Sequence, residues 1–180
     1  MSHAAEGIRA ASLPAGAGRS SADDWRRRMF TVDDFLAVDY IWAQALPVRQ
    51  RAMRGLAAIV DESFGLEAAS LAEKLRSHGA VRTLVRLLDD ESSGVHHRAL
   101  MVLGNLVGEF FDDEANQSLA LLCDAGGLEK VLDHLERPFP SNLYAAACLQ
   151  NMTAIDDACC TTLRDAGCIP MLQALLPDDS

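Results

Sequence analysis

Aromatic residues are scarce in this 180-residue sequence, at only 6 %, with two Trp, two Tyr and six Phe. The apolar fraction is nevertheless 49 %, so any core must be built mainly from Leu, Val, Ile, Ala, Met and Cys. Side chains of this size suit closely packed helices. The shortage of aromatics therefore favours a helical core, in a chain whose length is typical of one domain.

Basic residues are also in deficit, since 16 Lys and Arg stand against 26 Asp and Glu, for a formal net charge of −10. This excess opposes general affinity for nucleic acid phosphates and for anionic membrane surfaces. No secretory signal is recognisable, and no stretch approaches the roughly 20 apolar residues of a membrane span. Five cysteines cannot all pair within the chain, which indicates a reducing compartment. We expect a cytoplasmic location, with the nucleus as the alternative, and partners other than nucleic acid or membrane.

The residues that carry most enzyme and metal chemistry lack the spacing they would need. The cysteines are Cys123, Cys148, Cys159, Cys160 and Cys168. No two of them form the C-x-x-C pair of a zinc site, and no pattern brings a histidine beside a thiol. His96 and His97, at the start of a long helical pattern, are expected to face solvent. We predict no enzyme, no metal and no cofactor; Cys159 and Cys160 are the nucleophile candidates in the alternative case.

Residues 1–29 are rich in Ala, Gly, Ser and Arg and show no sustained hydrophobic periodicity. Such a composition favours disorder. A targeting peptide is the alternative because the segment is basic in places, but Glu6, Asp23 and Asp24 argue against it, since transit peptides are poor in acidic residues.

The rest of the chain shows helical periodicity, and no segment shows the alternation of a strand. Thr31 to Asp34 resembles a capping box that would begin a helix reaching about Ala45. Pro47 is placed to open the next helix, and Ser141 to cap a later one. Further helices are expected at 66–77, 81–88, 95–107, 115–124, 128–135, 142–154 and 157–165, followed by a last one that holds Pro170 in its first turn.

Two patterns recur at a nearly constant interval. A glycine followed by an apolar stripe appears at Gly79, Gly126 and Gly167, with separations of 47 (126 − 79) and 41 (167 − 126) residues. A second pattern ends in Asn105 and again in Asn151, 46 residues later (151 − 105). Self-similarity at a period of roughly 40–47 residues is typical of a helical solenoid.

These patterns resemble the armadillo repeat of the importin-alpha and beta-catenin kind. The matching stripe residues are Val81, Leu84, Val85, Leu87 and Leu88, then Leu128, Val131, Leu132 and Leu135, then Ile169, Leu172, Leu175 and Leu176. The resemblance implies an all-α, right-handed superhelix whose third helices line a concave groove that binds extended peptides. We expect a domain over 30–180, with a partial repeat at 31–62, repeats at 63–110 and 111–155, and a partial repeat at 156–177.

The candidate groove residues follow from the resemblance and from helical spacing. Asn105 and Asn151 match the family's peptide-binding asparagines, and a carboxamide can both donate to and accept from a peptide backbone. An alternative role for each Asn is to bond a neighbouring helix and fix the stack. Positions four and seven before each Asn share its face. Before Asn105 they are Met101 and Arg98, and before Asn151 they are Ala147 and Tyr144. On the first long helix, where Ala58 stands in place of the Asn, they are Arg54 and Arg51.

Three of these groove positions are arginines, which suit forked recognition of carboxylates or phosphates. We therefore predict an adaptor or scaffold that binds an extended, acidic or phosphorylated peptide; the alternative is an arginine face paired with Glu62 and Glu109.

Nuclear-transport members of the family carry Trp four residues before the Asn, a position that holds Arg54, Met101 and Ala147 here. A nuclear-transport adaptor and an armadillo-type chaperone regulator remain the alternative functions. The last repeat lacks its long helix, which predicts either that the chain continues or that another chain covers this end, for example by self-association.

Overall fold

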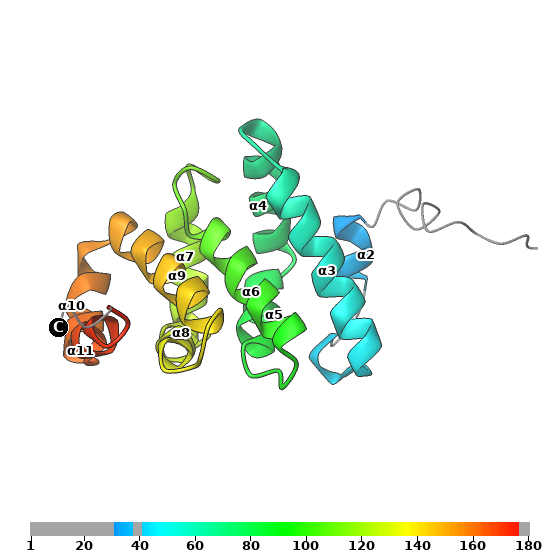
Figure 1. The fold of residues 1–180 in the computed structure, drawn as a ribbon. Coiled ribbons are helices and arrows are strands. Elements are labelled where there is room, and N and C mark those ends of the chain that lie inside the picture. The colour runs from blue at the N-terminus through cyan, green and yellow to red at the C-terminus, as the bar shows by residue number, and fades with distance from the viewer. Residues whose placement is uncertain (1–30, 38–40, 177–180) are drawn as a thin grey trace, which may run out of the picture.

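The computed structural model describes residues 31–37 and 41–176, and within these residues every regular element is a helix. The expectations for residues 1–29 lie outside this part of the chain. The helices follow one another in a row, from α2 at one end to α10 and α11 at the other (Figure 1). Among the described helices, none combines the length and the apolar character that crossing a membrane requires.

The row begins with α2 (Val32–Leu36), a 3-10 turn η1 (Ile41–Ala43) and α3 (Leu46–Glu62). The capping box is confirmed, because Thr31 Oγ1 accepts from the Asp34 amide and the Asp34 carboxylate accepts from the Thr31 amide. The expectation of one helix as far as Ala45 is wrong, since α2 ends at Leu36. Phe35 and Ile41 are both buried, and on one continuous helix they would point about 120° apart, so the break lets both enter the core. Pro47 lies in the first turn of α3, as predicted.

Two complete three-helix units and one helix pair follow. The first unit is α4 (Leu66–Ser77), α5 (Ala80–Leu87) and α6 (Ser93–Leu106); the second is α7 (Ala115–Asp124), α8 (Gly127–Leu135) and α9 (Ser141–Ile155); the pair is α10 (Asp157–Asp165) and α11 (Cys168–Gln173). The predicted bounds of α4, α7 and α10 are confirmed, and those of α5, α6, α8 and α9 differ from the structure by one or two residues at one or both ends.

The glycine between the first and second helix of each unit has a left-handed backbone, with φ of 73° at Gly79, 71° at Gly126 and 79° at Gly167. A Cβ added at any of the three would meet no heavy atom within 4 Å. The sequence therefore needs glycine there for its backbone conformation rather than for space.

The third helices α3, α6 and α9 lie side by side in front of the other helices in the view of Figure 1. The stripe of α6 packs inward as predicted, with Ala99, Val102, Leu103 and Leu106 fully buried. Gly104 faces α9, where an added Cβ would make an ordinary van der Waals contact 3.6 Å from the Cα of Cys148. These contacts make one continuous hydrophobic core along the row.

Buried ion pairs join consecutive units. Arg49 of α3 pairs with Asp90 before α6, and Arg76 of α4 pairs with Asp112 before α7. Asp90 and Asp112 are only 4 % and 3 % exposed at their side chains. Because each pair spans roughly one repeat in sequence, it fixes how one unit stacks on the next.

Candidate functional site

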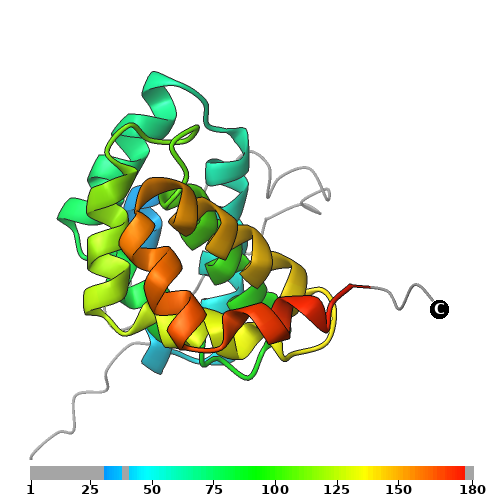
Figure 2. The ribbon, with the colours of Figure 1, turned by 90° about the vertical axis from the view of Figure 1, so that its left-hand side faces the viewer.

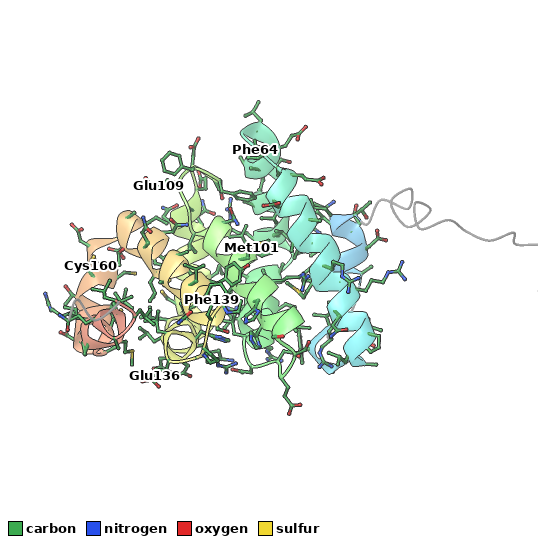
Figure 3. The ribbon with its side chains drawn as sticks, viewed as in Figure 1. Phe64, Met101, Glu109, Glu136, Phe139 and Cys160 are labelled. Atoms are coloured by element: carbon green, nitrogen blue, oxygen red, sulfur yellow. The ribbon has the colours of Figure 1, made fainter. Side chains whose placement is uncertain are left out.

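The third-helix face comprises the outward residues of α3, α6 and α9 that the sequence singles out. Arg51, Arg54 and Ala147 are exposed, whereas Arg98, Met101, Asn105, Tyr144 and Asn151 are half-buried. Met101 lies near the middle of this face, on α6 (Figure 3). Because α3 packs against α6 and α6 against α9, the structure brings these residues onto three adjacent helices.

The two asparagines make different hydrogen bonds. Asn105 Nδ2 donates to the Met101 carbonyl of its own helix at 2.9 Å. Asn151 Nδ2 donates to the Gly104 carbonyl on α6 at 2.8 Å. Asn151 therefore links two units, while the contact of Asn105 stays within one helix. Among the described residues, neither Oδ1 atom accepts a hydrogen bond, so each can still accept one from a bound backbone N–H.

Glycines accommodate the Asn151 amide. A Cβ added at Gly108 would lie 3.1 Å from Asn151 Nδ2 and 3.2 Å from the Asn105 carbonyl. Any larger residue at position 108 would crowd both third helices at this point. Gly108 is a residue that the repeat pattern does not single out, and its lack of a side chain leaves room for the Asn151 amide.

No ion pair within the described part of the chain joins Arg51, Arg54 or Arg98 to a carboxylate. The alternative pairing with Glu62 and Glu109 is not observed there. Arg98 Nη1 donates to the Gly94 carbonyl at 2.6 Å, which fixes its direction along α6. The Asp34 carboxyl has a lowered pKa, chiefly through its hydrogen bonds from Thr31 and to a lesser extent through the charge of Arg51. These guanidiniums therefore keep most of their hydrogen-bonding capacity for a ligand.

A buried histidine cluster lies between the two complete units. His96, His97 and His134 surround the hydroxyl of Ser141, with His97 Nε2 2.9 Å from Ser141 Oγ and the other two ring nitrogens at 3.4 Å. His96 is only 7 % exposed, so the expected exposure of this residue is wrong. Ser141 does not cap α9 as predicted, because Pro140 is the N-cap residue and the Ser141 side chain is buried in the cluster.

The hydrogen bonds of this cluster define its protonation. His134 Nε2 lies 2.9 Å from the Leu88 carbonyl and His96 Nδ1 lies 2.7 Å from the Asp90 carbonyl, so both nitrogens must donate. Burial is the first cause that lowers the pKa of His134 and of His97, and nearby Arg137 contributes to both. These two rings are therefore uncharged at neutral pH and stabilise the stack.

Repeat alignment could have revealed the buried position of His134. This residue lies 47 positions after Leu87 (134 − 87), which is a core leucine in the preceding unit. In the described ranges, no group of three or more His, Cys, Asp or Glu side chains is arranged to hold a metal ion.

Four of the five cysteines have thiols with raised pKa values, and the fifth, Cys160, is exposed. Burial raises the pKa of Cys148 to about 12 and, as the largest cause, that of Cys159 to about 11. The pKa values of Cys123 and Cys168 are also raised, mainly by burial. A thiol must lose its proton to act as a nucleophile, so these four groups are poorly suited to catalysis at neutral pH.

We expect Cys148 and Cys159 to react with iodoacetamide at pH 7 more slowly than free glutathione, because little of either thiol is ionised. Mass spectrometry of peptides after timed labelling measures this rate site by site, and labelling in urea provides the control in which burial is removed. Labelling of Cys159 in the folded chain faster than glutathione would contradict this assignment and restore the nucleophile alternative.

Comparison with known proteins places this architecture in a class. The sequence matches no protein-family profile and no curated protein. Among solved structures, it is similar to the designed armadillo repeat protein YIII(Dq)4CqI, at 24 % identity and a TM-score of 0.65, over 83 % of this chain and 58 % of that one. An engineered protein matches at 26 % identity and a TM-score of 0.65, over 83 % and 56 % of the two chains.

A third similar structure is a designed armadillo repeat protein in complex with the peptide (KR)4. It shares 21 % identity and a TM-score of 0.64, over 81 % of this chain and 56 % of that one. The chain thus spans little more than half the length of the structures it matches. Together with the three-helix units, these similarities show an armadillo-like repeat fold, an all-α solenoid.

Proposed function

We propose that the chain is a non-catalytic protein-interaction module, an adaptor or scaffold that binds an extended peptide along the third-helix face. The fold supports this proposal, since one similar structure is a complex with a peptide. The open Oδ1 atoms of Asn105 and Asn151 support it further. Stacked helices lie about 8–10 Å apart and an extended peptide rises about 3.3 Å per residue, so one asparagine per unit meets the peptide every two to three residues.

We propose further that the peptide is acidic or phosphorylated. The observation that carries this proposal is that Arg51, Arg54 and Arg98 form no ion pair with a carboxylate among the described residues of a chain with net charge −10. Guanidiniums form strong paired hydrogen bonds with carboxylates and phosphates. The peptide (KR)4 of the similar structure is basic, whereas these arginines favour a ligand of the opposite charge.

Reversing the charges of the three arginines tests this proposal. The probe is a fluorescein-labelled ten-residue peptide of alternating Glu and phosphoserine, and fluorescence anisotropy measures its dissociation constant. We expect the Arg51→Glu/Arg54→Glu/Arg98→Glu variant to bind it at least about 100-fold more weakly than wild type. This factor corresponds to about 3 kcal/mol, or about 1 kcal/mol for each guanidinium removed.

The matched control reverses three exposed arginines away from the third-helix face, Arg82 and Arg86 on α5 and Arg164 on α10. It changes net charge equally and should weaken binding less than about threefold, since distant exposed charges are screened by salt. Equal losses in both variants, or tighter binding of (KR)4 than of the acidic probe by wild type, would refute the acidic specificity.

The asparagines test the binding mode separately. If the two carboxamides form hydrogen bonds with the peptide backbone, Asn105→Ala/Asn151→Ala should weaken binding about tenfold, because each lost hydrogen bond costs about 0.5–1.5 kcal/mol of binding free energy. A thermal melt of the variant controls for the lost bond between Asn151 and Gly104. Unchanged affinity would instead favour a partner that is gripped through surface contacts, as in the chaperone-regulator alternative.

A further inference from the structure

Two cysteine thiols meet where the second complete unit joins the helix pair α10 and α11. Cys123 lies near the end of α7 and Cys159 near the start of α10, and the Cys159 thiol donates a hydrogen bond to the Cys123 sulfur. Both are free thiols; Cys123 is exposed, and Cys159 is only 7 % exposed. Figure 2 looks onto this end of the row, where α10 lies nearer the viewer than α7. The two sulfurs are therefore in contact across a junction between units.

The repeat relates this contact to a contact at the preceding junction. Cys123 lies 47 residues after Arg76 (123 − 76), and Cys159 lies 41 residues after Ser118 (159 − 118). The same intervals separate the left-handed glycines of these units. Arg76 Nη1 donates to Ser118 Oγ at 3.2 Å. The stacking that brings α4 against α7 thus also brings the two cysteine positions together.

A carboxylate accompanies both contacts. Asp112 pairs with Arg76 and accepts a hydrogen bond from the amide two residues later, at 3.1 Å. Asp156, before α10, accepts in the same way from the Ala158 amide at 2.8 Å, and its charge acts on both thiols. The later junction therefore keeps the carboxylate but has a cysteine where the earlier one has the arginine of a buried ion pair.

We propose that Cys123 and Cys159 form a reversible disulfide that fastens α10 and α11 to the second complete unit. The covalent bond takes the place that the ion pair of Arg76 and Asp112 holds one junction earlier. It links positions 36 residues apart (159 − 123), and a crosslink of this kind stabilises chiefly by restricting the unfolded chain.

Glutathione disulfide is the oxidant, and the bond forms in two exchange steps. The exposed Cys123 loses its proton to water, its thiolate attacks one sulfur of glutathione disulfide, and a glutathione thiolate leaves. Cys159 then loses its proton and attacks the Cys123 sulfur of the mixed disulfide, and the second glutathione thiolate leaves. The two cysteines lose two electrons in total, and glutathione disulfide gains them; reduced glutathione reverses both steps.

The two steps differ in rate for a structural reason. Burial is the largest cause that raises the pKa of both thiols, so little thiolate is present at neutral pH and the first step is slow. The second step is intramolecular, because the Cys159 thiol already contacts the Cys123 sulfur. The mixed disulfide at Cys123 is therefore converted to the internal disulfide as it forms.

Treatment of the full chain with glutathione disulfide at pH 8 tests the proposal. Remaining thiols are blocked with N-ethylmaleimide, and non-reducing peptide mass spectrometry identifies the linked cysteines. We expect a link between the peptides that hold Cys123 and Cys159, in wild type and in the matched control Cys160→Ser. Cys159→Ser should lose the link while keeping the fold, since serine occupies the corresponding buried position 118. Cys123→Ser, at an exposed position, should lose it as well.

Hydrogen exchange measures what the bond does to the junction. Backbone amides of α10 should exchange at least about tenfold more slowly in the oxidised chain than in the reduced chain, because the crosslink suppresses local opening, and dithiothreitol should restore the faster rate. A link that persists in Cys159→Ser would overturn the proposal. So would chains that carry only glutathione adducts, disulfide-linked dimers in place of the internal bond, or an internal bond that leaves exchange in α10 unchanged.

Discussion

Replacing Asp112 by Ala should destabilise the folded chain by about 3–5 kcal/mol, because Arg76 would remain buried without its charge partner. The side chains of Arg76 and Asp112 are 10 % and 3 % exposed. Arg76 also donates to Ser118 at 3.2 Å, and Asp112 accepts from the Glu114 amide at 3.1 Å. The pair therefore ties α4 to the loop before α7 and to α7 itself, and its loss loosens the stacking of two units.

Urea denaturation followed by circular dichroism measures the free energy of unfolding of this variant. Asp113→Ala is the matched control, since Asp113 is the exposed neighbour in sequence and should change stability by less than about 0.5 kcal/mol. If Asp112→Ala stayed within the same limit, the ion pair would not be what stabilises this junction.

Replacing His134 by Ala should destabilise the chain by about 2–4 kcal/mol. The side chain is 1 % exposed and donates to the Leu88 carbonyl. Its loss leaves this acceptor unsatisfied, which costs about 1–3 kcal/mol, and opens a cavity in the core. His134→Gln, which keeps a donor, should recover part of the loss in the same denaturation experiment, whereas equal losses in both variants would show that the hydrogen bond contributes nothing.

A fall in pH should weaken the contact between the two complete units at the histidine cluster. The folded-state pKa values of His134 and His97 lie below the ordinary value of 6.5, so the unfolded chain binds protons first as the pH falls. The stability that depends on neutral rings is therefore present above pH 6.5 and is lost as the pH falls through 6.5 toward the lower folded-state values. Arg98 and Arg137 are among the charges that oppose protonation of His97.

Unfolding free energies at pH 7.5 and pH 5.5 measure this dependence. Wild type should lose more stability over this interval than His134→Gln, since the variant has one fewer buried imidazole to charge. Identical losses in the two proteins would mean that other groups, such as the carboxylates of the interunit ion pairs, set the acid response.

The helices could be predicted from the sequence because their signals are local. Left-handed glycines such as Gly79 mark helix ends through backbone conformation alone, and the stripe of α6 reflects its own period. The predictions that proved wrong depend on contacts between units or between distant segments. Ser141 has the right residue type for a cap, but its hydroxyl is turned toward His97 of the preceding unit, and the break after α2 depends on two side chains entering one core.

The positions of the candidate site could also be predicted, but not its hydrogen bonds. Helical spacing assigned Arg98 and Asn105 to one face, because that depends only on the geometry of one helix. The bond from Asn151 to the Gly104 carbonyl depends on how closely α9 approaches α6.

NMR titration of the isotope-labelled chain with the acidic phosphopeptide maps peptide binding along α3, α6 and α9. We expect chemical-shift changes in the side-chain amides of Asn105 and Asn151 and in the guanidinium signals of Arg51, Arg54 and Arg98. Changes confined to α5, α8 or α11, with these side-chain signals unmoved, would contradict it.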